Sequence, residues 1–169
     1  MKKTYSLLIA ALAVTCLATP VQAANHYGSI FGGAVWMNDS ALNTGMTGTA
    51  ALGCDYGSTR LEAEVGWQNN DIDFNNDDVN LYTLMSNGYY DVDLGGVDLY
   101  GTVGVGVAET SSPNYYRGDR TDLAYQFGAG IAAPIANKVK LDARYRYFTT
   151  IDNPSLSSHS ALLGVQVGF

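Results

Sequence analysis

Apolar and polar residues alternate along most of the chain beyond residue 23. The alternation is clearest in four segments: Thr59–Gln68, Leu99–Val107, Lys138–Thr149 and His159–Phe169. Because successive side chains of a strand point to opposite faces, a period of two predicts β-strands. Weaker alternation marks four more: His26–Trp36, Met46–Tyr56, Asn80–Val92 and Leu123–Ala132. Eight predicted strands of about 10 to 13 residues are longer than most strands of soluble sheets and match what a bilayer requires.

The links between these predicted strands alternate between long and short. The long links are Met37–Gly45, Asn69–Asp78, Glu109–Asp122 and Thr150–Ser157, and the short ones are Gly57-Ser58, Asp93–Val97 and Ala133–Asn137. Strict alternation places every long loop at one rim. Bacterial outer-membrane barrels have this arrangement, with long loops outside and both termini in the periplasm. The expected fold is therefore all-β, an eight-stranded antiparallel up-and-down transmembrane β-barrel.

A membrane barrel differs from a soluble one in the face of the strands on which its apolar residues lie. A soluble, lipocalin-like barrel would point its apolar residues inward. Here the polar stripe is rich in Gly, Ser and Thr rather than Lys and Glu, which suits a narrow lumen. The chain also ends on Phe169, preceded at every second position by Val167, Val165 and Leu163. This ending resembles the carboxy-terminal signal that the bacterial barrel-assembly machinery recognises, so we expect these four residues to act in assembly.

Charged residues of two predicted strands fall on the inferred lumen face. Glu62 and Glu64 lie on the third strand, and Asp142, Arg144 and Arg146 lie on the seventh. In a barrel of eight strands these two strands face each other, so the charges can pair across the lumen. Paired carboxylates also serve acid–base catalysis, but neighbouring guanidiniums keep carboxylates ionised. We therefore expect a structural charge network in a lumen filled by side chains, which is not an open porin channel.

The first 23 residues are typical of an export signal. A basic start precedes the apolar run Leu7–Val14, which is too short to span a membrane. Small residues up to Ala23 fit a signal peptidase site. The sequence thus predicts a signal peptide over 1–23 and an outer-membrane barrel domain over 24–169. A lipoprotein signal that uses Cys16 is the alternative.

Composition narrows the class of protein further. The chain has 169 residues, of which 19 are glycine and 12 tyrosine, and a formal net charge of −7. Many glycines and few glutamates disfavour helices, and the acidic balance argues against nucleic acid as a partner. Once Cys16 leaves with the signal, Cys54 has no second cysteine for a disulfide. We expect it to be a small buried or lipid-facing side chain.

Two patterns resemble functional sites, one a calcium-binding loop and the other a catalytic histidine–serine pair, but neither fits the requirements of its site. Asn69–Asp78 is acidic and resembles the start of an EF-hand loop, but Asn76 stands where the glycine belongs and Tyr82 where the bidentate glutamate belongs. No metal site is predicted there. His159 and Ser160 are adjacent on a strand, so they point to opposite faces and cannot act together as base and nucleophile.

Aromatic residues near the ends of the predicted strands fit girdles at the two lipid boundaries. These residues are Trp36, Trp67, Tyr82, Tyr100, Tyr125 and Tyr147. The longest predicted loop carries Tyr115, Tyr116 and Arg117, which are the candidates for contact with a surface ligand.

Five stretches together resemble the opacity-type, OmpA-like outer-membrane β-barrel family, often described as porin family. They are 60–66 (RLEAEVG), 86–91 (SNGYYD), 100–106 (YGTVGVG), 141–147 (LDARYRY) and 160–169 (SALLGVQVGF). Their order and spacing carry the resemblance, which spans the whole chain after the signal. It implies an eight-stranded barrel and, in some members, adhesion or host contact through the loops.

The sequence predicts an integral protein of the bacterial outer membrane with a structural or surface-interaction role, without catalytic residues, cofactors or metal. The expected partners are outer-membrane lipid and lipopolysaccharide, the barrel-assembly machinery during biogenesis, and a host or surface ligand through the loops. Two alternatives stay open. One is a lipid-modifying barrel enzyme, and the other is a periplasmic, lipocalin-like ligand carrier.

Overall fold

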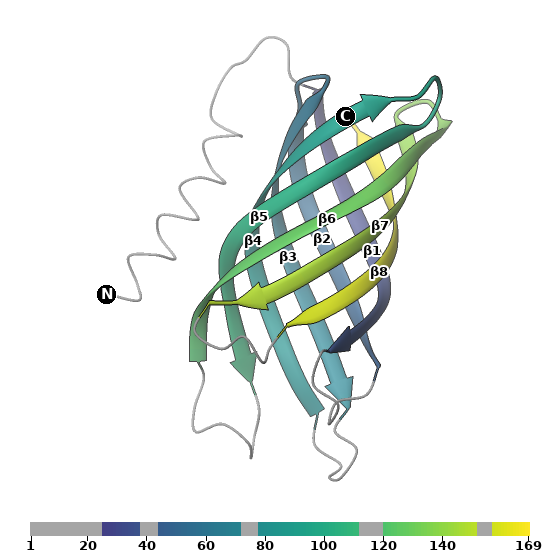
Figure 1. Cartoon of the computed structure of the whole chain (residues 1–169). Helices are drawn as coiled ribbons and strands as arrows, with labels where there is room; N and C mark the ends of the chain where they lie inside the picture. The colour runs from purple at the N-terminus through teal and green to yellow at the C-terminus, as the bar shows by residue number, and fades with distance from the viewer. Residues whose placement is uncertain (1–24, 38–43, 72–77, 112–119, 152–156) are drawn as a thin grey trace.

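The protein is built from eight antiparallel strands (Figure 1). The computed structural model describes residues 25–37, 44–71, 78–111, 120–151 and 157–169. The strands are β1 (Asn25–Met37), β2 (Gly45–Asp55), β3 (Thr59–Asp71), β4 (Asp78–Asp93), β5 (Asp98–Ser111), β6 (Arg120–Ala136), β7 (Val139–Thr150) and β8 (Ser158–Gly168). They range from 11 residues in β2 and β8 to 17 in β6. Within these described ranges, no helix is long and apolar enough to cross a membrane.

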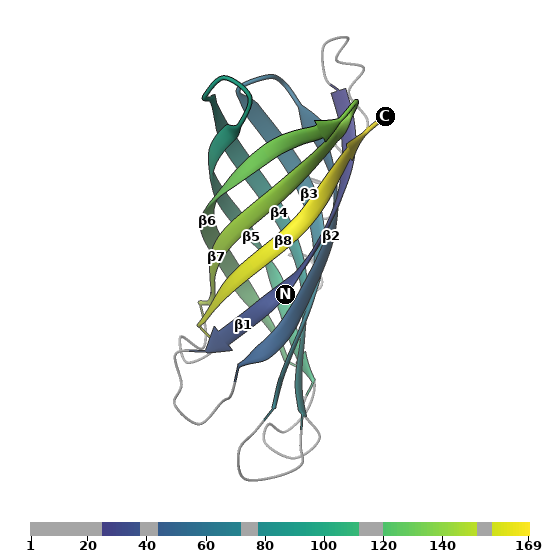
Figure 2. The ribbon, with the colours of Figure 1, turned by 90° about the vertical axis from the view of Figure 1, so that its right-hand side faces the viewer.

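The sheet closes into a barrel of strongly tilted strands (Figure 2). Each strand pairs with its neighbours in sequence, and β1 also pairs with β8. This closing seam runs from Tyr27 opposite Gly168 to Met37 opposite Ser158. Closure leaves no strand edge with unpaired backbone groups, which a lipid environment could not satisfy. The predicted eight-stranded, up-and-down antiparallel barrel is confirmed.

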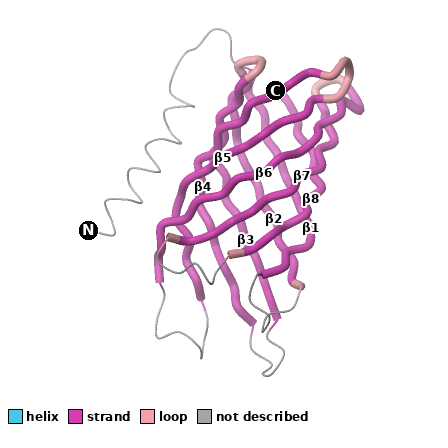
Figure 3. The backbone as a smooth tube through the Cα atoms, viewed as in Figure 1, coloured by secondary structure: helices cyan, strands magenta, loops and turns pink. Residues whose placement is uncertain are grey.

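The short connections lie together at one end of the barrel, where β8 also ends (Figures 1 and 3). Glycine supplies the positive φ angles that such tight turns need. Gly57 has a φ of 96° and Gly95 a φ of 81°. Their backbone N–H groups donate to the carboxylates of Asp55 and Asp93 at 2.8 and 2.7 Å. The strand ends that flank the long connections lie at the opposite end.

Several predicted connections are shorter in the structure because the strands around them continue to pair. The prediction that Ala133–Asn137 is a turn is wrong, since β6 runs on to Ala136 and the turn begins only after it. A register shift between Pro134 and Ala136 creates an irregularity that tolerates a residue without an N–H donor. Likewise, β5 and β6 extend into the predicted link Glu109–Asp122, where Glu109 pairs with Thr121.

The outer wall is apolar and the lumen is polar. Val103 and Leu163, on β5 and β8, are 67% and 66% exposed. The inward-facing Glu64 and Asp142 are 1% and 0% exposed. A soluble barrel would have the opposite distribution, with charges outside and apolar side chains within.

Candidate functional site

The lumen contains a network of buried charges that joins β3 to β7. Glu64 accepts a hydrogen bond from the Nη1 of Arg144 at 3.4 Å, and its other oxygen lies 3.6 Å from the Nη1 of Arg146. Gln126 donates to the same carboxylate at 3.2 Å. The Glu64 side chain is 1% exposed and those of the arginines 2% and 6%. These contacts connect opposite walls of the barrel and leave each charge with a partner of opposite sign.

Glu62 is held by hydroxyl groups rather than by an arginine. Tyr27 donates to its Oε1 at 2.8 Å, and the Tyr89 hydroxyl donates to its Oε2. Ser29 lies at 3.5 Å from Oε1. These donors come from β1 and β4, which lie on either side of β3 in the sheet, so one carboxylate binds groups from both directions.

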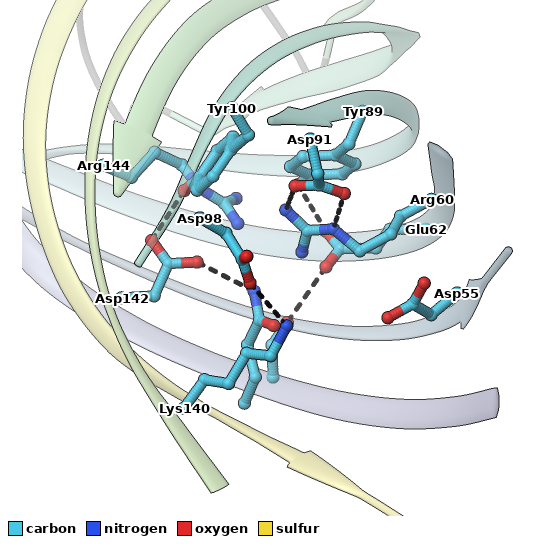
Figure 4. A network of polar contacts seen from close by, with 12 residues as sticks. Asp55, Arg60, Glu62, Tyr89, Asp91, Asp98, Tyr100, Lys140, Asp142 and Arg144 are labelled. Carbon is cyan, nitrogen blue, oxygen red and sulfur yellow. Dashed lines mark hydrogen bonds and ion pairs between the residues drawn. The ribbon is translucent and has the colours of Figure 1, made fainter. Parts of the chain in front are cut away.

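Nearer the short connections, Arg60 forms a bidentate ion pair with Asp91 of β4 (Figure 4). Its Nε and Nη2 each lie 2.7 Å from a carboxylate oxygen. The guanidinium also lies 4.5 Å from the ring centre of Tyr89 and 5.0 Å from that of Tyr100. Planar stacking and a two-pronged hydrogen bond are the contacts that arginine makes well and lysine does not.

Tyr100 connects Asp142 to Arg144 (Figure 4). Its hydroxyl donates to Asp142 at 2.6 Å and accepts from the Nε of Arg144 at 3.0 Å. Gln166 donates to the second oxygen of Asp142 at 2.8 Å. The hydroxyl therefore works in both directions, which allows an acid and a base on the same strand to share one bridge.

Toward the end with the long connections, a buried apolar cluster shares the lumen with buried polar side chains such as Gln68, Asn70 and Ser158. The buried cluster comprises Leu81, Met85, Ala108, Ala124 and Phe148. The charge network lies next to this cluster, nearer the short connections. Together they fill much of the barrel interior with side chains. A barrel of eight strands has an interior just wide enough for side chains to fill.

All five charged residues predicted to face the lumen do so. The structure brings Glu64, Arg144 and Arg146 into direct contact. It does not pair Glu62 or Asp142 directly with an arginine. Tyrosine hydroxyls donate hydrogen bonds to these two carboxylates instead. The partners of these residues that the sequence did not indicate include Tyr27, Tyr89, Tyr100, Gln126 and Gln166. The separate pair of Arg60 with Asp91 was also missed.

The prediction that Tyr100 belongs to an aromatic girdle is wrong. Its side chain is 2% exposed and lies in the lumen. Strand parity contained the signal, since Tyr100 falls on the same side as the inward-facing Thr102 and opposite Leu99. The predicted girdle residues Trp36 and Tyr82, by contrast, are outward and 39% and 52% exposed.

The carboxy-terminal residues proposed as an assembly signal form an exposed stripe on β8 and at its end. Leu163, Val165, Val167 and Phe169 are 66%, 39%, 47% and 71% exposed. Phe169 stacks on His26 with ring centres 6.4 Å apart.

The remaining predicted residues lie in two groups. Cys54 is buried, with its Sγ 3.4 Å from the Nδ1 of His26. Ser160 is fully buried in the lumen whereas His159 lies on the outer wall, so the two residues cannot cooperate in catalysis.

Other predictions fall outside the described residues. These are the signal peptide over 1–23, the centre of the acidic link Asn69–Asp78, and the loop residues Tyr115, Tyr116 and Arg117. Among the residues that are described, no group of three or more histidine, cysteine or acidic side chains could hold a metal ion.

A closed antiparallel barrel with an apolar outer wall and charges in its lumen defines the class of outer-membrane β-barrels. Comparison with protein families agrees with this class. The chain belongs to the family described as outer membrane protein beta-barrel domain, whose model matches residues 8–169. It is therefore a bacterial outer-membrane β-barrel protein. No curated protein sequence matches the chain.

Solved outer-membrane proteins share the fold. Neisserial surface protein A (NspA) superposes with a TM-score of 0.67 at 19% identity, covering 87% of this chain and 97% of that protein. Ail of Yersinia pestis, in complex with the heparin analogue sucrose octasulfate, gives 0.57 at 16%, covering 86% and 99%. The outer membrane enzyme PagL gives 0.53 at 17%, covering 85% and 99%.

Proposed function

We propose that this chain is a non-enzymatic outer-membrane scaffold that presents its long loops at the cell surface and has a side-chain-filled lumen. The observation that carries the proposal is the bridge from Glu64 to Arg144 and Arg146 across the lumen. A pore would need this space for water. A fully desolvated network instead ties opposite walls together and favours a structural role.

The connection lengths support an orientation. Outer-membrane barrels place long loops outside and short turns in the periplasm. Both termini are then periplasmic, where the exposed stripe at Leu163, Val165, Val167 and Phe169 is available to the barrel-assembly machinery during insertion. The apolar wall contacts outer-membrane lipid and lipopolysaccharide.

The loops are the proposed contact surface for a host or surface ligand. Tyr115, Tyr116 and Arg117 remain the proposed contact residues in the longest loop. The likeness to Ail, which is described in complex with a heparin analogue, supports a ligand-binding role for a barrel of this size.

A lipid-modifying enzyme is the second candidate, favoured by the likeness to PagL. His159 is the outward-facing histidine at the long-connection end. The rings and hydroxyl around it belong to Trp36, Tyr145 and Tyr147. The next outward residue on its strand, Ala161, has no hydroxyl. A hydrolase would need a nucleophile and a group that orients the base, and these neighbours supply neither a serine nor a carboxylate.

Mass spectrometry of lipid A from cells with and without the protein tests the proposal. We expect the same acyl composition in both, and no stepwise conductance from the purified protein in planar bilayers. A change in acylation that His159→Ala abolishes would establish the enzyme instead. Stable single-channel currents would contradict the filled lumen.

A further inference from the structure

A row of aromatic rings crosses the outer wall at the long-connection end. In register, Trp36 of β1 pairs with His159 of β8, which pairs with Tyr147 of β7, which pairs with Phe127 of β6. All four side chains point outward. Figure 2 looks onto this wall, where β7, β8 and β1 lie side by side. Such rows mark the boundary between acyl chains and polar head groups.

His159 lies among aromatic rings, and within the described part of the chain its Nε2 has no hydrogen-bond partner. It stacks on Trp36 with an interplanar angle of 11° and meets Tyr147 edge-on at 5.1 Å. The Tyr145 hydroxyl lies 2.6 Å from its Nδ1. When the tyrosine donates to Nδ1, the imidazole proton is on Nε2, which can donate to a head group. Among the described side chains of the outer wall at this end, His159 is the only basic group.

A shallow apolar groove of about 700 Å³ begins next to His159 and its aromatic neighbours, on the side toward the middle of the wall. Small residues form much of its floor on β1, β8 and β7, the strands of Trp36, His159 and Tyr147. They are Gly32 and Ala34 on β1, Ala161 on β8 and Ala143 on β7. A Cβ added to Gly32 would meet no atom within 4 Å, so the groove is open outward. Leu163 forms one side.

We propose that this wall binds one phosphorylated glycolipid of the outer leaflet. The phosphate accepts a hydrogen bond from the Nε2 of His159, a sugar ring packs on the exposed rings of Trp36 and Tyr145, and an acyl chain fills the groove over Gly32 and Ala161. The polar donor lies at the head-group boundary, and the apolar groove runs from it toward the bilayer centre. The two features therefore complement the head group and the acyl chain of a lipid. The proposal rests on the orientation given under the proposed function, because only then does this end lie in the glycolipid leaflet.

Binding of defined lipids to the folded, full mature protein in detergent, followed by native mass spectrometry, tests the site. The probes are bisphosphorylated lipid A, the same lipid without its phosphates, and phosphatidylglycerol. We expect lipid A to bind at least tenfold tighter than the lipid without phosphates, as a charge-assisted hydrogen bond implies. It should also bind tighter than phosphatidylglycerol, which has a phosphate but no sugar ring to pack on Trp36 and Tyr145. His159→Ala should remove most of that preference. Gly32→Leu should weaken all acyl lipids, because it fills the groove.

Matched variants control for general effects on the barrel. His26→Ala removes the outward histidine at the opposite end, and Gly101→Leu adds the same side chain at an outward glycine of β5 that also has no atom within 4 Å. Both should bind lipid A as the parent does. Equal binding of lipid A and phosphatidylglycerol, or parental binding by His159→Ala and Gly32→Leu, would overturn the site. Loss of an acyl chain from bound lipid A would contradict the proposed function and leave the site intact.

Discussion

Replacement of Glu64 by glutamine should lower the free energy of unfolding by about 3 kcal/mol. Glu64 is 1% exposed and lies between Arg144 and Arg146. Its neutralisation leaves two guanidinium groups in the lumen with less negative charge to balance them. Removal of one member of a buried ion pair is far more damaging than loss of the pair as a whole, because the remaining charge stays desolvated. Urea unfolding in lipid vesicles, followed by tryptophan fluorescence, measures the change.

A double-mutant cycle separates this coupling from general damage to the barrel. Arg146→Gln alone should be destabilising, and its combination with Glu64→Gln should lose less stability than the sum of the single losses. Glu109→Gln is the matched control, since Glu109 is exposed and lies on the outer wall at the rim. It should change stability by no more than about 0.5 kcal/mol. Strictly additive losses in the cycle would refute the coupling.

Substitution of Gly164 by alanine should lower the free energy of unfolding by about 2 to 3 kcal/mol. Gly164 faces the lumen on β8, and an added Cβ would lie 2.3 Å from the Cδ1 of Phe31 and 2.4 Å from the carbonyl oxygen of Ile30. The second contact is with backbone of the closing seam, which cannot move without disturbing the pairing of β1 with β8. Urea unfolding and the yield of folded protein both report the loss.

Gly32→Ala is the matched control on the same seam. Gly32 pairs with Leu163 next to the Phe31–Gly164 pair, but it faces outward and an added Cβ meets no atom within 4 Å. Alanine restricts the unfolded chain more than glycine does, so stability should stay the same or rise by up to about 1 kcal/mol. If Gly164→Ala and Gly32→Ala lowered the free energy of unfolding equally, the crowding inside the lumen would not be the reason that Gly164 must be a glycine.

The architecture could be predicted from the sequence because its determinants are local. A period of two assigns each residue to a face without knowledge of its neighbours, as for Glu62 and Glu64 on β3. The alternation of long and short links then determines the order of the strands. The continuation of β6 through Pro134 to Ala136 was missed, because the register shift that lets a proline lie within a strand depends on the pairing with β7.

The contacts inside the lumen could be predicted only in part. Parity places Asp142 and Arg144 inward, but the stagger between strands decides which residues they meet. That stagger brings Arg144 to both Tyr100 and Glu64, and leaves Asp142 to Tyr100 and Gln166. Tyrosine at an inward position is the sequence signal for these contacts, since its hydroxyl reaches across a narrow lumen to a carboxylate, as for Tyr89 and Tyr100.

The orientation of the side chains, with apolar groups toward lipid and charges in the lumen, is tested most directly by tryptophans placed at mid-wall. Val103→Trp and Leu163→Trp, each made after Trp36 and Trp67 are replaced by phenylalanine, add one fluorophore to a strongly exposed position of β5 or β8. In vesicles of lipid brominated near the middle of its acyl chains, both emissions should be strongly quenched, and aqueous acrylamide should have little effect. Quenching by acrylamide without quenching by the brominated chains would mean that this wall faces water.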